Sequence, residues 1–223
     1  MNYRHRVNGA VLDLPAGKAV CVGRNYAAHA KELNNPIPTE PVLFIKPNTA
    51  LVALGEQLSI PTQLGECHIE TEICILIGDK ITRGCDEAQA EAAIGGVGVA
   101  LDLTLRGLQQ QLKDKSLPWE KAKAFDGACP ISEFVSLDKV ADLQQLGIQL
   151  RHNSHMQQNG NSADMLTPVV PLLLYISQFF TLIPGDVVLT GTPAGVGPLA
   201  VGDQLEISLV DHVYCQTQVC AAG

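Results

Sequence analysis

The 223-residue chain has few aromatic residues, 4% of the total, and a shortage of positive charge, since 15 Lys and Arg stand against 23 Asp and Glu. The net charge of −8 disfavours attraction to phosphate backbones, so we expect no nucleic-acid partner. The most apolar stretch, MLTPVVPLLLYISQFFTLI, is interrupted by prolines and polar residues, which favours a buried helix over a membrane span. The N-terminus has no uninterrupted apolar region, so we expect neither a signal peptide nor a membrane partner.

The chain also lacks any C-x-x-C motif, although it has seven cysteines. An odd count without metal-type spacing, with several cysteines in apolar segments, is typical of buried free thiols. We therefore expect a reduced, cytoplasmic protein without a disulfide framework or a zinc knuckle.

Hydrophobic residues make up 46% of the chain, and it has 20 Gly and 13 Pro. This composition predicts a real core built from many short strands and turns. We expect one β-rich α+β domain over residues 1–223, in which residues 1–17 form an N-terminal appendage.

Hydrophobic patterning and turn residues predict the order of the elements. Strands are expected at 18–23, 40–47, 67–78 and 97–106, and a strand, a glycine turn and a second strand at 184–209. Helices are expected at 24–36, ended by Asn34, Asn35 and Pro36, and at 85–96 and 107–115. A loop covers 116–130, and a hairpin with an Asn153–Ser154 turn covers 147–160. A further helix is expected at 167–180, with Thr167 as N-cap and Pro168 at the first helical position.

The segment HIETEICILIG places Glu70 and Glu72 one residue apart at the start of an apolar run. On a strand, residues i and i+2 share a face and lie roughly 7 Å apart. Two such carboxylates repel each other unless something neutralises them, and burial raises the cost. A divalent cation would resolve both problems, and the alternative is an edge strand with two solvated glutamates.

Asp102 is the one acid in the expected strand VGVALDLTLR and lies on the opposite face from five aliphatic residues. It is either an ion-pair partner of Arg106 or a third metal ligand. Three carboxylates form an all-oxygen donor set, which favours Mg²⁺, with Mn²⁺ as a second option and Ca²⁺ as a weaker one. Such a set leaves about three octahedral positions open, as a catalytic site requires.

Six segments together resemble the fumarylacetoacetate hydrolase family, and most of all its short acylpyruvase and fumarylpyruvate hydrolase branch: CVGRNYAAHAKEL, PVLFIKP, HIETEICILIG, ALDLTLRGLQ, PWEKAKAFD and GDVVLTGTPAGVGP. The resemblance implies a mixed β-roll with small peripheral helices, usually in a homodimer. It implies Mg²⁺ or Mn²⁺ on Glu70, Glu72 and Asp102. It also implies a small-molecule 2-oxo acid substrate and C–C hydrolysis, decarboxylation or keto–enol tautomerisation.

His29 and Glu32 lie at i and i+3 of an expected helix, so they share a face. As a bare pattern this is an ordinary helix-surface contact, but the family resemblance implies a catalytic pair on a segment that closes over substrate. Lys123 is the third catalytic candidate, against the alternative of a solvated lysine. The candidates for binding substrate are Arg24, Arg106, Gln109, Thr192 and, more weakly, Lys46.

One position departs from the family pattern, because Gly107 stands where family members commonly carry an acid. Glycine is tolerated as an N-cap, so we expect a structural change only. The leading function is metal-dependent hydrolysis of acylpyruvates with release of pyruvate. The alternatives are an oxaloacetate tautomerase or decarboxylase and, in a different class, a non-catalytic binding protein.

Overall fold

The computed structural model describes residues 3–33 and 36–222. Its largest sheet is a mixed one, in which β14 runs parallel to β3, β11 runs parallel to β5, and the other neighbours are antiparallel. The order of its strands is β4 (Val42–Lys46), β3 (Ala19–Gly23), β14 (Val187–Leu189), β8 (Thr71–Ile77), β9 (Ile94–Leu101), β11 (Cys129–Ile131) and β5 (Leu51–Ala53).

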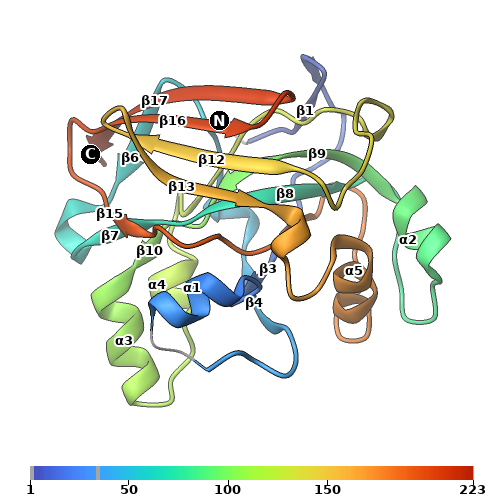
Figure 1. Ribbon diagram of the computed structural model, residues 1–223, viewed down its shortest axis with the longest axis horizontal. Coiled ribbons are helices and arrows are strands. Elements are labelled where there is room, and N and C mark those ends of the chain that lie inside the picture. The colour runs from blue at the N-terminus through green and yellow to red at the C-terminus, as the bar shows by residue number, and fades with distance from the viewer. Residues whose placement is uncertain (1–2, 34–35, 223) are drawn as a thin grey trace.

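A second sheet covers β8 and β9, as Figure 1 shows. Its strand order is β13 (His155–Asn161), β12 (Gly147–His152), β16 (Gln204–Leu209), β17 (Val213–Ala221) and β6 (Gln57–Ile60). The main core fills the space between the two sheets, where Ile73, Ile75 and Val99 on one side share a buried cluster with Leu150 and Ile207 on the other. The other face of β8 contributes Cys74 and Leu76 to a smaller apolar cluster.

The remaining strands of the described residues form two small sheets. One has the order β10 (Thr104–Leu105), β7 (Cys67–Ile69) and β15 (Gly197–Pro198), and the other is the hairpin of β1 (Arg6–Val7) and β2 (Ala10–Val11). The expected strand 67–78 is thus divided into β7 and β8, and the expected strand 97–106 into β9 and β10. Both divisions fall where the chain passes from the large sheet to the small one.

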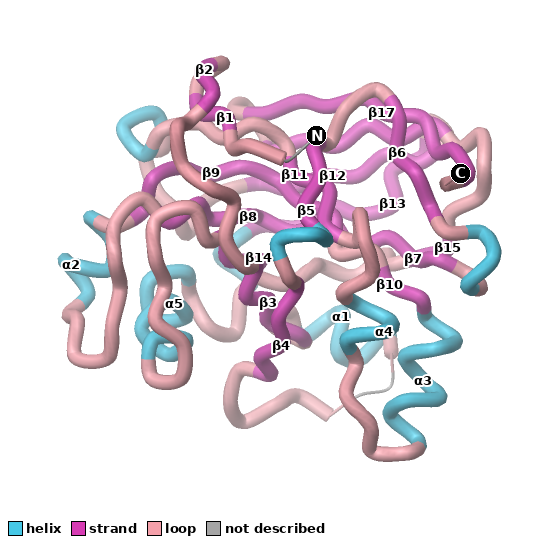
Figure 2. The backbone as a smooth tube through the Cα atoms, turned by 180° about the vertical axis from the view of Figure 1, so that it is seen from behind, coloured by secondary structure: helices cyan, strands magenta, loops and turns pink. Residues whose placement is uncertain are grey.

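The helices are short and lie at the periphery (Figures 1 and 2). Three helices lie below β7 and β10 in Figure 1: α1 (Ala27–Glu32), α3 (Arg106–Asp114) and α4 (Glu120–Lys123). The other two, α2 (Glu87–Ala92) and α5 (Val169–Ser177), contact each other near the other end of β8 and β9. In the described part of the chain, 3-10 turns occupy Asn48–Ala50, Thr62–Leu64, Leu137–Lys139 and Ser162–Asp164. The predicted β-rich α+β class is confirmed.

Some local expectations need correction. The N-cap of α5 is Pro168 and not Thr167, because Pro168 keeps an extended ψ of 162°. The expected loop 116–130 contains α4 and the first two residues of β11. The hairpin turn is confirmed, since Asn153 and Ser154 have φ values of 49° and 67°, as the favoured two-residue turn requires. The predicted stop at Asn34 and Asn35 lies outside the described residues.

Residues 3–17, the described part of the expected appendage, are anchored to two segments that flank strands of the large sheet, one after β11 and one before β14. Phe134 donates its backbone N–H to Arg6 at 2.8 Å, and Asn8 donates to Phe134 at 2.9 Å. The His5 side chain is buried, and its Nε2 lies 2.9 Å from the Gly185 carbonyl oxygen. Within residues 3–33 and 36–222, none of the helices has the length and apolar character needed to cross a membrane.

Candidate active site

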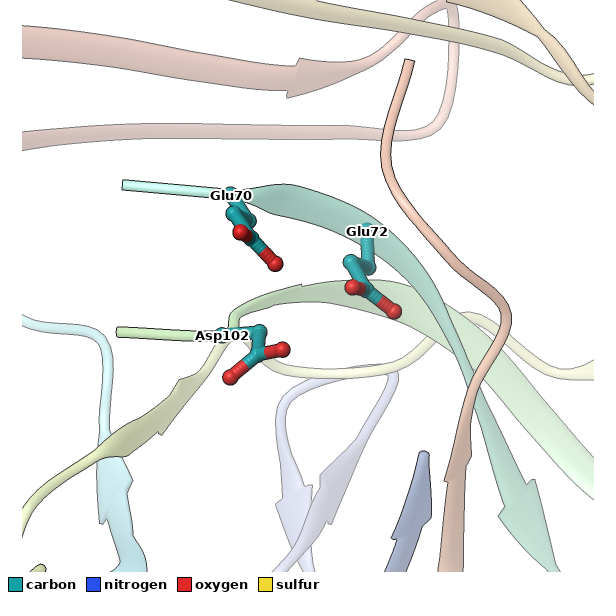
Figure 3. A group of neighbouring side chains, drawn as sticks. All are labelled: Glu70, Glu72 and Asp102. Carbon is teal, nitrogen blue, oxygen red and sulfur yellow. The ribbon is translucent and has the colours of Figure 1, made fainter. Parts of the chain in front are cut away.

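Three carboxylates meet where the paired strands β7–β8 and β9–β10 leave the large sheet (Figure 3). Thr71 pairs with Leu101 and His68 with Thr104, so one continuous antiparallel register places Glu70 directly opposite Asp102. The Asp102 N–H donates to the Glu70 carbonyl oxygen at 2.8 Å. Directly opposed residues project from the same face, and Glu72 projects from that face two residues further along.

The three side chains are buried and converge. Glu70, Glu72 and Asp102 are 5%, 1% and 1% exposed, and each offers a carboxylate oxygen within 4.8 Å of the others. The interpretation of Glu70 and Glu72 as solvated edge residues is therefore wrong. Glu72 lies on the same face of β8 as Cys74 and Leu76, and Glu70 lies just before β8 on that face, so the two glutamates stand at the end of a buried apolar face.

Cations surround the triad. Arg106 forms an ion pair with Glu70, and Lys123 Nζ lies 2.9 Å from Glu70 Oε2 and 2.5 Å from Asp102 Oδ2. Lys46 Nζ lies 2.8 Å from Asp102 Oδ1. Asp102 is thus paired with two lysines, and the alternative pairing of Asp102 with Arg106 is wrong.

The pKa values of the two glutamates are shifted in opposite directions by their surroundings. Burial alone raises the pKa of Glu70, but the charges of Lys123, Arg106 and His29 outweigh burial and hold that pKa below its ordinary value. Burial and the charges of Asp102 and Glu70 raise the pKa of Glu72 well above its ordinary value. Lys123 keeps a raised pKa, because Asp102 and Glu70 outweigh the effect of its burial.

The triad fits a divalent cation by the chemistry of its donors. Three buried carboxylates with oxygens within 4.8 Å of one another form an all-oxygen set, which hard cations such as Mg²⁺ and Mn²⁺ prefer. A bound dication would also relieve the repulsion that raises the pKa of Glu72. The Gly191 N–H donates to Glu72 Oε2 at 2.6 Å and so orients this carboxylate.

The glycine-rich segment after β14 supports the triad through its backbone. Gly191 has φ 95°, and a Cβ there would lie 2.8 Å from the Asn25 Cβ, so no other residue fits without displacement. Thr192 lines the pocket, and its hydroxyl donates to the Thr71 carbonyl at 2.9 Å and accepts from Gln158 at 2.8 Å. Its hydroxyl therefore already has both a donor and an acceptor within the protein.

A pocket opens over Glu70 and Glu72 and brings most of the predicted residues together. The predicted residues on its wall are Arg24, His29, Arg106, Gln109, Lys123 and Thr192. His29 is 5% exposed and its Nδ1 lies 3.2 Å from Glu32 Oε2, while Glu32 Oε1 accepts the Gly195 N–H at 3.0 Å. Glu32 itself lies outside the wall and contacts His29, which lies on it.

Lys46 is placed differently from a substrate-binding residue. It is 0% exposed and absent from the pocket wall, and its ammonium donates to the Ala128 carbonyl at 3.1 Å as well as to the Lys123 carbonyl. Lys46 therefore pairs with Asp102 inside the protein, away from the pocket wall. Gln109 is also engaged, since its Oε1 accepts from Arg106 at 2.9 Å.

Comparison with known proteins places this geometry in a family. The family model described as "Fumarylacetoacetate (FAA) hydrolase C-terminal" matches residues 18–220. The chain belongs to the fumarylacetoacetate hydrolase family. Among solved structures, a family protein from Yersinia pestis is 50% identical with a TM-score of 0.94, covering 98% of this chain and 100% of that one. The resemblance inferred from sequence and the predicted mixed β-roll are confirmed.

The family relatives differ in activity. The oxaloacetate tautomerase YcgM of Escherichia coli is 49% identical over 213 residues, 95% of this chain and 97% of that protein. The human mitochondrial oxaloacetate tautomerase FAHD1 is 40% identical over 190 residues, 85% of this chain and 86% of that protein. A fumarylpyruvate hydrolase from Pseudomonas aeruginosa, solved with Mn²⁺ and pyruvate, is 32% identical with a TM-score of 0.92, covering 99% of this chain and 97% of that one. These relatives favour the tautomerase alternative over the leading hydrolase interpretation.

Several residues that line the pocket over Glu70 and Glu72 were not identified from the sequence: Leu33, Val42, Phe44, Lys113 and Trp119. Lys113 could have been found, because Arg106, Gln109 and Lys113 stand at i, i+3 and i+7 and so follow one face of α3. The apolar residues had no such signal. Gly107 lies one residue after the first residue of α3, whose N-cap is Leu105, so the expectation that Gly107 caps this helix is wrong.

Proposed function

We propose that this family member is a keto–enol tautomerase of oxaloacetate that depends on a divalent cation, Mg²⁺ or Mn²⁺. The observation that carries the proposal is His29, a buried histidine hydrogen-bonded to a carboxylate, on the wall of the pocket that Glu70 and Glu72 of the carboxylate triad also line. The 49% identity with a bacterial oxaloacetate tautomerase supports the choice of reaction.

The triad of Glu70, Glu72 and Asp102 would hold the cation. When bound, the cation supplies positive charge near the 2-oxo and carboxylate oxygens of the substrate, where the enolate charge develops. Lys123 adds a second charge there, because its raised pKa keeps its ammonium protonated. Arg106, Gln109 and Thr192 line the same wall and orient the substrate's 2-oxo acid end.

Tautomerisation moves one proton from C3 to the oxygen on C2, and His29 is the group placed to carry it. Its Nδ1 faces Glu32, which fixes the ring, so Nε2 remains for the substrate. Nε2 removes the C3 proton as the C2–C3 double bond forms, and the same proton is returned to the C2 oxygen to give the enol. The reverse sequence regenerates the keto form, so neither water nor any second reactant is consumed.

The proposal is tested by adding enolic oxaloacetate to the purified protein with Mg²⁺ and following the loss of the enol's ultraviolet absorbance. We expect ketonisation well above the background rate, abolished by chelation of the metal. His29→Ala should lower kcat by about 10²–10⁴-fold, as is typical for the loss of a general base. An unchanged rate of ketonisation with and without the protein would overturn the proposal.

Acylpyruvate hydrolysis is a second candidate, favoured by the fumarylpyruvate hydrolase solved with Mn²⁺ and pyruvate. That reaction needs a water molecule activated by His29 to attack the distal carbonyl. A panel of acylpyruvates, assayed for pyruvate release beside oxaloacetate, separates the two activities. Decarboxylation of oxaloacetate is assayed in the same panel, because it also passes through an enolate.

Two coarser expectations accompany the proposal. We propose a cytoplasmic protein, supported by the seven free cysteines, of which Cys21, Cys74 and Cys129 are fully buried. The homodimer implied by the family resemblance stays a prediction, and size-exclusion chromatography with light scattering would test it.

A further inference from the structure

Two of the four cations on the pocket wall have no acidic partner. Arg106 and Lys123 are both paired with Glu70, whereas no ion pair or side-chain hydrogen bond joins Arg24 or Lys113 to an acid within residues 3–33 and 36–222. Both side chains are half-buried. A half-buried cation in a pocket is stabilised when the ligand brings the missing negative charge.

Lys113 is held over the pocket by its helix and by an aromatic ring. It stands two turns after Arg106 on the same face of α3, and its Nζ lies 5.2 Å from the centroid of the Trp119 ring. Burial lowers the pKa of Lys113, and the charges of Arg24, Arg106 and Lys123 lower it further. The Glu70 carboxylate opposes part of this shift, and Lys113 lines the same pocket as the other three cations.

Arg24 is held by an unusual backbone. It occupies the turn between β3 and α1 with φ 62°, in the left-handed region that residues with a Cβ rarely adopt. Such strain is concentrated at ligand-binding sites, where the surrounding structure maintains it. The turn brings the Arg24 side chain onto the wall that also contains Lys113.

The charges around the pocket exceed what one carboxylate can balance. Arg24, Arg106, Lys113, Lys123 and the underlying Lys46 oppose the three carboxylates of the triad, which leaves an excess of two positive charges. A divalent cation on the triad widens this excess. In a chain with a net charge of −8, such a local surplus selects for a ligand with more than one negative charge.

We propose that Arg24 and Lys113 form a subsite for the second carboxylate of the substrate, so that the pocket selects short 2-oxo dicarboxylates over 2-oxo monocarboxylates. This inference rests on the proposed function for the position of the first carboxylate, which lies at the triad. It adds the residues that bind the far end of the substrate. Both are specificity-determining residues, and neither takes part in the proton transfer.

Kinetics with a matched pair of substrates test the subsite. Oxaloacetate and its 4-ethyl ester share the 2-oxo acid end and differ in the second charge. Lys113→Met keeps the aliphatic stem over Trp119, and Arg24→Asn keeps a residue that tolerates a left-handed backbone. Each variant should lower the ratio of kcat/KM for oxaloacetate to that for the ester by about 10–100-fold, the loss expected for one charged hydrogen bond. Lys115→Met is the control, because Lys115 is exposed and lies off the pocket wall.

A binding measurement decides the subsite without relying on catalysis. The chain has a single tryptophan, Trp119, and it lines the pocket, so its fluorescence reports a bound ligand. Malate and 2-hydroxybutyrate share a carbon skeleton, and only malate has the second carboxylate. With Mg²⁺ present, we expect the wild-type protein to bind malate at least about tenfold more tightly, and Lys113→Met to remove most of that preference.

The two experiments distinguish the inference from the function on which it rests. If the wild-type protein binds malate and 2-hydroxybutyrate equally, or if Lys113→Met weakens both ligands alike, the subsite is overturned. If the malate preference is present and sensitive to Lys113 while oxaloacetate is not tautomerised, the subsite stands and the proposed function fails.

Discussion

Glu32 bridges His29 and the glycine-rich segment, since one of its carboxylate oxygens lies 3.2 Å from His29 Nδ1 and the other accepts the Gly195 N–H at 3.0 Å. Helix α1 is thereby tied to the segment that also orients Glu72 through Gly191. The side chain of Glu32 is 32% exposed, whereas that of His29 is 6% exposed. The carboxylate is thus placed to fix the orientation of the buried imidazole.

We predict that Glu32→Gln retains more activity than Glu32→Ala, because the single amide oxygen of glutamine can still accept the hydrogen bond from His29 Nδ1, whereas the bond from Gly195 is lost. Glu32→Ala should lower kcat for oxaloacetate ketonisation by about tenfold or more, because a misoriented base loses much of the advantage of proximity. KM should change little, since Glu32 lies outside the pocket wall. Equal kcat values in Glu32→Ala and the wild type would show that the bridge has no role in positioning His29.

A second prediction concerns the metal. At a Mg²⁺ concentration of 100 times Kd, binding should stabilise the wild-type protein by about 2.7 kcal/mol, or roughly 5–10 °C in Tm. Glu72→Gln should abolish that increase, while Glu91→Gln, an exposed change on α2, should leave it intact. The measurement is the difference in Tm with and without Mg²⁺. A normal increase in Glu72→Gln would remove Glu72 from the ligand set.

A third prediction concerns Gly107, which is exposed in the first turn of α3 and where an added Cβ would meet nothing within 4 Å. Gly107→Asp should raise the free energy of unfolding by up to ~1 kcal/mol, through lower backbone entropy in the unfolded chain and a favourable charge near the helix N-terminus. Denaturant unfolding measures the gain, and Gly107→Ala separates the backbone effect from the charge effect. We expect ketonisation to be unchanged in both variants, and a loss of turnover would place Gly107 in the active site.

A fourth prediction concerns pH and His5. Burial lowers the pKa of His5, and its hydrogen bond to Gly185 and the nearby Asp186 only partly oppose this effect. The neutral ring is therefore favoured in the folded protein, so its contribution is complete above the unfolded pKa of about 6.5 and is lost as pH falls through the lower folded value.

The free energy of unfolding should accordingly fall as the pH drops below about 6.5, by at most ~1.4 kcal/mol per pH unit from this group. His5→Gln keeps a donor near Gly185 but does not titrate, so its pH dependence should be shallower. His155→Gln, an exposed change in the β12–β13 turn region, is the control and should follow the wild type. Parallel curves for His5→Gln and the wild type would contradict this assignment.

Local patterns were enough to identify much of the candidate site. Alternation on a strand placed Glu70 and Glu72 on one face, a lone acid among aliphatic residues marked Asp102, and helical spacing joined His29 to Glu32. These inferences succeed because each depends on backbone periodicity over a few residues. The spacing of Arg106, Gln109 and Lys113 carried the same kind of signal for the pocket.

The sequence by itself therefore determined the β-rich class, through composition and periodicity, and the face shared by Glu70 and Glu72, through strand alternation. The family came from the resemblance of six sequence segments to known members. Only the tertiary structure decided which distant groups meet. The register that opposes Glu70 to Asp102, the burial of Lys46 beneath Asp102 and the pairing of Arg106 with Glu70 all arise from strand pairing and packing between segments far apart in the chain. Side-chain periodicity leaves such pairings undefined, since many registers present the same face and only the complete packing of both sheets selects one.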